Sequence, residues 1–182
     1  MKHIYIFVCL FLLNGVVSAD NVIVGAFGQK LGMPINATDH PVDFFHTIED
    51  ERGAWVHNFI PTSIYHPFMT YQVHSTPVTK LIFMIRAFGS IDKKKCAIER
   101  DIIKTVLKDK YSKAYENVIG QKTMYGIGAR FIDVGCKYLN SNDDEVEYFS
   151  ATDSILSIDY VDIPLHNAVV DEKASQVDKS NF

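Results

Sequence analysis

Short stretches of alternating apolar and polar residues fill much of the first half of the chain and predict β-strands. The stretches 21–27, 53–60 and 68–75 are rich in β-branched or aromatic residues and are bounded by glycine, proline or serine. The stretch 80–88 differs, because residues 81–85 are apolar on both faces. A run of this kind is typical of a strand covered on both sides. We therefore expect a sheet with residues 80–88 in its interior.

A spacing of three and four residues between apolar positions, from Ile91 to about Tyr115, predicts one long helix. Two rows recur at this spacing, while lysine and aspartate residues occupy the other face of the helix. The rows are Ile98, Ile102, Val106 and Ile103, Leu107, Tyr111. Ser90 or Asp92 can cap its first turn. The amphipathic pattern is typical of a helix that packs on a sheet.

Strand patterns return after Gly120. The stretches 125–138, 145–151 and 154–163 are separated by turn-forming residues and predict a C-terminal three-stranded meander. Beyond Leu165 we expect one or several helical turns in a polar tail over residues 166–182, which frays toward its end. The pattern as a whole predicts an α+β fold: a mainly antiparallel sheet with the long amphipathic helix (about 91–115) packed on it, in a single domain over residues 20–165.

The N-terminus has the three parts of a cleavable secretory signal peptide. Lys2 supplies the positive charge, residues 4–17 form the apolar core, and residues 17–19 place short side chains before the cleavage point. The apolar core is too short to cross a bilayer as a permanent helix. We expect residues 1–19 to be removed and the mature chain, without a membrane span, to be secreted or periplasmic. In a eukaryotic host, export would also make the sequon at Asn36 a glycosylation site.

Export changes the meaning of the cysteines. Cys9 leaves with the signal peptide, so the mature chain holds only Cys96 and Cys136. Two cysteines in an oxidising compartment favour a disulfide bond. Two buried free thiols and a zinc site are the alternatives, and neither cysteine has a C-x-x-C partner. The bond requires the helix that carries Cys96 to lie beside the first meander strand, which carries Cys136.

Charge and motifs narrow the class of protein. The formal net charge is −4 at pH 7, with no stripe of lysine and arginine, which argues against nucleic acid and against anionic membrane surfaces as partners. The chain lacks the G-x-S-x-G motif, a calcium-binding loop and a complete phosphate-binding glycine loop. We therefore expect no cofactor and favour a non-enzymatic protein, with a hydrolase of dispersed site as an alternative.

Aromatic residues gather between two of the predicted strands. The candidate binding residues are Trp55, Phe59, Tyr65 and Phe68, in a segment that also holds two prolines. Most apolar residues belong to the core, but a rigid aromatic loop is also a typical anchor for a protein partner. This loop is the candidate surface for binding another protein.

Histidines support a second hypothesis, a periplasmic metal-binding protein. Five histidines fall between residues 40 and 74, and His57, His66 and His74 are the candidate ligands. His57 and His74 lie on predicted strands, from which they can face each other across a sheet. No H-x-H or H-E-x-x-H motif accompanies them.

The order of features resembles a group of bacterial periplasmic or secreted α+β proteins of unknown function. The matching segments are 27–33 (FGQKLGM), 85–89 (IRAFG), 107–111 (LKDKY) and 158–162 (IDYVD). The resemblance implies an envelope or extracellular location and assigns no catalytic residue. The chain also lacks catalytic motifs and has an aromatic segment suited to binding a protein. Together with the resemblance, these features lead us to expect an exported binding protein of accessory or inhibitor/immunity type.

Overall fold

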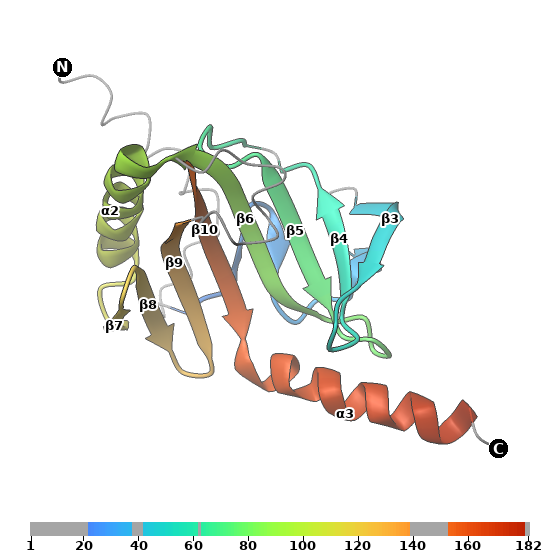
Figure 1. Ribbon diagram of the computed structural model, residues 1–182. Coiled ribbons are helices and arrows are strands. Elements are labelled where there is room, and N and C mark those ends of the chain that lie inside the picture. The colour runs from blue at the N-terminus through green and yellow to red at the C-terminus, as the bar shows by residue number, and fades with distance from the viewer. Residues whose placement is uncertain (1–21, 38–41, 62, 139–152, 181–182) are drawn as a thin grey trace.

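The fold is built around one eight-stranded antiparallel sheet in the order β3-β4-β5-β6-β10-β9-β8-β7 (Figure 1). The structure is a computed structural model, and it describes residues 22–37, 42–61, 63–138 and 153–180. The strands are β3 (Val42–Glu49), β4 (Trp55–Phe59), β5 (Thr70–Ser75), β6 (Ile82–Asp92), β7 (Tyr115–Ile119), β8 (Lys122–Ile127), β9 (Arg130–Tyr138) and β10 (Asp153–Asp162). Two α-helices, α2 (Lys93–Lys110) and α3 (Ile163–Ser180), and one turn of 3-10 helix (Ile35–Ala37) accompany it in the described residues. The expected α+β class with a large antiparallel sheet is confirmed. The signal-peptide prediction and the predicted strand 145–151 lie outside the described residues.

β6 is the interior strand that its apolar run predicts. It pairs antiparallel with β5 on one side and with β10 on the other. Its side chains enter two separate cores: Ile85 and Ala87 join the larger one, while Phe83 and Met84 join the smaller. Burial on both faces is the reason for the unbroken apolar run.

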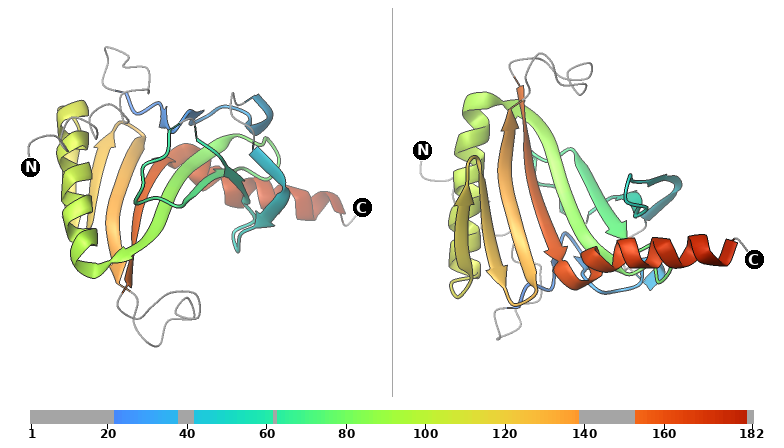
Figure 2. Two further views of the ribbon diagram at one scale, coloured as in Figure 1. Left: turned by 90° about the horizontal axis from the view of Figure 1, so that it is seen from above. Right: turned by 60° about the horizontal axis from the view of Figure 1, so that its bottom comes forward.

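The two cores lie on opposite faces of the sheet. The larger core takes Ile103 and Leu107 from α2 and Ile23 and Leu31 from the N-terminal segment. The helix and this segment lie over different parts of the sheet (Figure 2). The smaller core forms where Val169 of α3 packs beneath the sheet. Each element thus buries one apolar side against the sheet, as amphipathic elements do.

The long helix is shorter at both ends than its sequence pattern predicts. β6 continues through Ile91, which pairs with Ser154, and α2 begins only at Lys93. Asp92 is the N-cap, because its carboxylate accepts hydrogen bonds from the backbone N–H groups of Lys94 (3.0 Å) and Lys95 (3.2 Å). The helix ends at Lys110, and the residues from Tyr115 onward form β7 instead.

The C-terminal sheet contains more strands than expected. The stretch 125–138 was expected as one strand, but it contains the end of β8 and all of β9, which form a hairpin that turns at Gly128 with φ of +61°. β7 precedes them, so β7, β8, β9 and β10 form a run of four successive antiparallel neighbours. At the N-terminus, the expected strand 21–27 is reduced to β1 (Gly25–Ala26), which pairs with β2 (Gln29–Lys30).

A second long helix, α3, forms where a polar tail with some helical turns was expected. It follows β10 directly, and the Asp162 carboxylate accepts a hydrogen bond from the N–H of Leu165 (3.3 Å). Further along, the Glu172 carboxylate accepts from the N–H of Val78 (2.8 Å) and the hydroxyl of Thr79 (2.6 Å), in the turn between β5 and β6. These contacts hold α3 across the ends of the central strands, and its last turns extend past the sheet (Figure 1).

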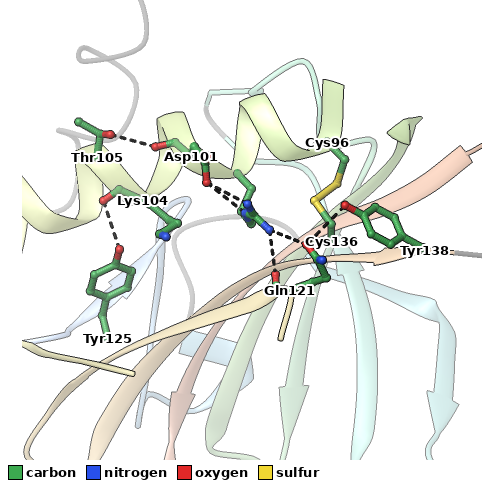
Figure 3. A network of polar contacts seen from close by, with 9 residues as sticks. Cys96, Asp101, Lys104, Thr105, Gln121, Tyr125, Cys136 and Tyr138 are labelled. Carbon is green, nitrogen blue, oxygen red and sulfur yellow. Dashed lines mark hydrogen bonds and ion pairs between the residues drawn. A yellow bond between two sulfur atoms is a disulfide. The ribbon is translucent and has the colours of Figure 1, made fainter. Parts of the chain in front are cut away.

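The predicted disulfide bond joins Cys96 of α2 to Cys136 of β9, with their Cα atoms 6.1 Å apart. This separation lies within the usual range for disulfides. Beside it, the Arg100 guanidinium donates to the side-chain oxygen of Gln121 (2.8 Å), in the turn between β7 and β8 (Figure 3). The hydroxyl of Tyr138 donates to the same oxygen at 3.4 Å. The helix is therefore fixed covalently to β9 and by hydrogen bonds to the neighbouring turn.

Candidate functional site

The four candidate aromatic residues do not form one exposed patch. Phe59 and Phe68 are buried, with 6 % and 3 % of their surface exposed, and belong to the larger core. Tyr65 is partly buried and packs on Phe68, with ring centroids 5.5 Å apart. Trp55 lies at the other end of β4, where the Lys80 ammonium sits 4.7 Å from the centre of its ring. The structure thus brings three of the four together, with their rings largely turned inward.

Other residues of the same segment face the solvent. Ile60, Ile64 and Met69 have 76 %, 56 % and 77 % of their surface exposed. We call the part of the chain formed by residue 60 and residues 63–69 the apolar loop. No lysine, arginine, aspartate or glutamate occurs between residues 60 and 69. The loop therefore presents an uncharged apolar surface, which is a typical feature of a protein-binding site.

Hydrogen bonds hold the apolar loop in one conformation. The N–H of Tyr65 donates to the hydroxyl of Tyr71 (3.0 Å), and the N–H of Phe68 donates to the carbonyl of Tyr65 (2.8 Å). At the end of the loop, the N–H of Met69 donates to the carbonyl of Phe88 on β6 (3.0 Å). A loop fixed in this way loses little conformational entropy on binding.

The Tyr65 hydroxyl ties the loop to α2. It donates to a carboxylate oxygen of Glu99 at 2.5 Å. Burial, together with this carboxylate, raises the pKa of Tyr65, so the phenol stays protonated and keeps its donor role. Gly89 permits the close approach of the loop to the sheet, because a Cβ at this position would lie 2.1 Å from the carbonyl oxygen of Pro67.

The candidate metal ligands are kept apart. His57 pairs across the sheet with Val73, and His74 with Val56, so the two histidines point to opposite faces of the sheet. The expectation that they face each other is therefore wrong. His66 is exposed in the apolar loop. Within the described part of the chain, no three histidine, cysteine or acidic side chains are grouped so that they could hold a metal ion.

The two buried histidines differ in their surroundings. The hydroxyl of Thr47 lies 2.9 Å from Nδ1 of His57. His74 is 5 % exposed, and both of its ring nitrogens are buried without a hydrogen-bond partner. Its ring lies 6.0 Å from that of Phe83, centroid to centroid. Burial, reinforced by the charge of Arg86, lowers the pKa of His74 to about 3.

A row of polar residues crosses the sheet on the face that carries His74. Register places Gln72, Arg86, Asp159 and Asp133 directly opposite one another on β5, β6, β10 and β9. Arg86 donates two hydrogen bonds to the Asp159 carboxylate (2.8 and 2.9 Å). Burial and the nearby Asp159 raise the pKa of Asp133, although Lys122 donates to it at 3.2 Å. The sequence pattern does not reveal this row, because only strand register brings its members together.

The described helices include none that is both long and apolar enough to cross a membrane. Comparison of the chain with models of protein families, with curated proteins and with solved structures gave no match in any of the three.

Proposed function

We propose that the protein is a secreted or periplasmic binding protein, without enzymatic activity, that engages another protein through its apolar loop. The observation that carries this proposal is the contrast within one short segment. Phe59, Tyr65 and Phe68 pack inward, whereas Ile60, Ile64 and Met69 are more than half exposed. Exposed apolar residues on a fixed support are typical of the central contacts of protein interfaces.

The chemistry of the loop favours a protein partner with an apolar surface of its own. The uncharged stretch offers nothing to a phosphate group, and the chain as a whole carries a net charge of −4. The disulfide bond supports an oxidising compartment, where such bonds persist. An inhibitor or immunity-type factor, or an accessory protein of the cell envelope, would act in this way.

Replacing Ile60, Ile64 and Met69 together with serine is expected to weaken partner binding by roughly tenfold or more, because interface-centre residues each contribute on the order of 1–2 kcal/mol. The fold should be retained, since exposed side chains usually change stability by less than about 0.5 kcal/mol each. The matched control is Ile98→Ser on α2, since Ile98 is 59 % exposed but lies outside the loop.

The partner is found by a photo-crosslinking amino acid placed at position 64 or 98 of the full chain in the producing cells. We expect a discrete adduct from position 64 and none from position 98. Excess wild-type protein should compete the adduct away, whereas the triple serine variant should not. Equal adducts from both positions, or no adduct from position 64, would refute the proposal.

A further inference from the structure

β7 ends the sheet at the side where α2 lies, and no described strand pairs with its outer edge (Figure 1). All five of its residues are exposed, including Tyr115 (55 %), Val118 (59 %) and Ile119 (63 %). Natural edge strands usually carry charged side chains (lysine above all), a proline or a bulge that blocks pairing with another chain. β7 has no lysine or proline, its single charged residue Glu116 is paired with Lys108 of α2, and it pairs with β8 without a register shift. β3 at the opposite edge is interrupted by a shift between Asp43 and Ile48.

The turn after β7 determines which backbone groups face outward. Ile119 pairs with Lys122, so Gly120 and Gln121 form a two-residue turn. Residues that flank such a turn are a hydrogen-bonded pair, and pairs alternate along an antiparallel ladder. The N–H and C=O groups of residues 115, 117 and 119 therefore point to β8. Those of Glu116 and Val118 point to the open edge.

We propose that β7 pairs antiparallel with β7 of a second copy of this chain, about a two-fold axis at Asn117. In this register, Glu116 lies opposite Val118 of the partner subunit, and Val118 lies opposite Glu116 of the partner subunit. These are the residues whose backbone groups face outward, so each pair exchanges two hydrogen bonds. The proposal stands independently of the function assigned to the apolar loop.

Side chains also match in this register. Tyr115 faces Ile119 of the partner subunit, which is an aromatic and β-branched pair of a favourable kind. Asn117 faces the partner subunit's Asn117, and amide side chains can donate and accept between themselves. No pair opposes like charges. This self-match is the reason to assign the edge to a second copy rather than to an unrelated extended peptide.

α2 lies at the same side of the sheet as β7, but its main contacts are with β6, β9 and β10. It contacts β7 through an ion pair between the Lys108 ammonium and the Glu116 carboxylate, 3.4 Å apart. A two-fold axis normal to the sheet joins the two sheets edge to edge, with each α2 over its own strands.

The first test measures the oligomeric state of the wild-type chain and of variants that change the charge of β7. We expect the mature wild-type chain to be a dimer by light scattering after size-exclusion chromatography. Val118→Glu places a carboxylate opposite Glu116 of the partner subunit, and the two-fold axis repeats this repulsive pair. The substitution should therefore weaken dimerisation roughly tenfold or more. Val118→Lys places opposite charges there and should keep the dimer. Ile48→Glu on β3 is the control and should also keep it.

Cysteine cross-linking gives the second test and checks the register. Across a two-fold axis at Asn117, the two Cα atoms of residue 117 lie about 4.5 Å apart, as in other non-hydrogen-bonded pairs. Residue 118 and its symmetry mate are offset along the strands by two residues, which separates their Cα atoms by about 8 Å. That distance is too long for a disulfide bond. Asn117→Cys should therefore form a covalent dimer on oxidation, whereas Val118→Cys should not.

Three results would overturn the proposal. The first is a wild-type chain that stays monomeric at every concentration tested. The second is a dimer that Val118→Glu leaves as strong as the wild type, which would place the interface elsewhere, or an equal loss of the dimer in Val118→Glu and Val118→Lys while circular dichroism shows both variants folded. The third is cross-linking of Asn117→Cys no faster than that of Val118→Cys. The first of these results, together with binding of extended peptides along β7, would assign the edge to such a peptide instead of a second copy.

Discussion

Replacing Cys96 and Cys136 together with alanine is expected to lower the free energy of unfolding by about 4 kcal/mol. The bond joins residues 40 positions apart, and the closed loop restricts the unfolded chain far more than the folded one. For a domain of this size, the loss corresponds to a fall in Tm of roughly 8–16 °C. Calorimetry or urea unfolding of the purified protein gives the measurement.

Reduction provides the control for this prediction. Wild-type protein unfolded in the presence of a reductant should lose a similar amount of stability, and the double alanine variant should not respond to the reductant. Any extra loss in the variant measures the small cavity left by the two buried sulfur atoms. A variant within about 1 kcal/mol of the oxidised wild type would contradict the expected effect.

The second large effect is a dependence of stability on pH that arises at His74. The pKa of His74 is about 3 in the folded protein, against an ordinary value of 6.5. Between these values the unfolded chain binds a proton that the folded chain does not bind. The free energy of unfolding is therefore undiminished by His74 above pH 6.5. It falls as the pH is lowered from 6.5 toward 3, by up to about 1.4 kcal/mol per pH unit.

His74→Leu removes this proton-binding difference and should flatten the pH dependence. Urea unfolding of the variant and the wild type should show a stability difference that grows steadily in favour of the variant as the solution is made more acidic. His66→Leu is the matched control, because His66 is exposed. Parallel curves for His74→Leu and the wild type would show that the buried ring does not govern acid sensitivity.

Features that depend on local pattern were predictable from the sequence. The apolar run 80–88 predicted an interior strand, because burial on both faces leaves no polar alternation. The helix beginning near Asp92 followed from apolar spacing and a capping residue. The disulfide bond was predicted from the two cysteines that remain if residues 1–19 are removed. Its prediction required Cys96 and Cys136 to lie on neighbouring elements, as they do.

Features that depend on tertiary contacts were not predictable. Ile91 continues the apolar spacing of the helix, yet it pairs with Ser154 in the sheet, since a long β10 partner outweighs local helical preference. The register that separates His57 from His74 is decided by strand pairing, where a shift of one residue reverses the face. Strand register also decides the polar row from Gln72 to Asp133, which therefore could not be predicted from the sequence.

The sequence indicated which segment forms the candidate site, but not which of its side chains are exposed. The segment that holds Phe59 and Phe68 was identified because aromatic and proline residues cluster there. Which side chains point outward depends on how the loop folds back on the sheet beside Gly89. The exposed members are therefore Ile60, Ile64 and Met69, which the aromatic pattern alone does not single out.

The closed loop between Cys96 and Cys136 also contains β7, β8 and the turn between them. A protease that cuts the chain in that turn would leave two fragments joined through sulfur, since the cut falls between the two cysteines. The fragments would migrate as a single species until the bond is reduced. For a protein that meets extracellular proteases, the bond would thus preserve the assembled molecule after a backbone break between β7 and β8.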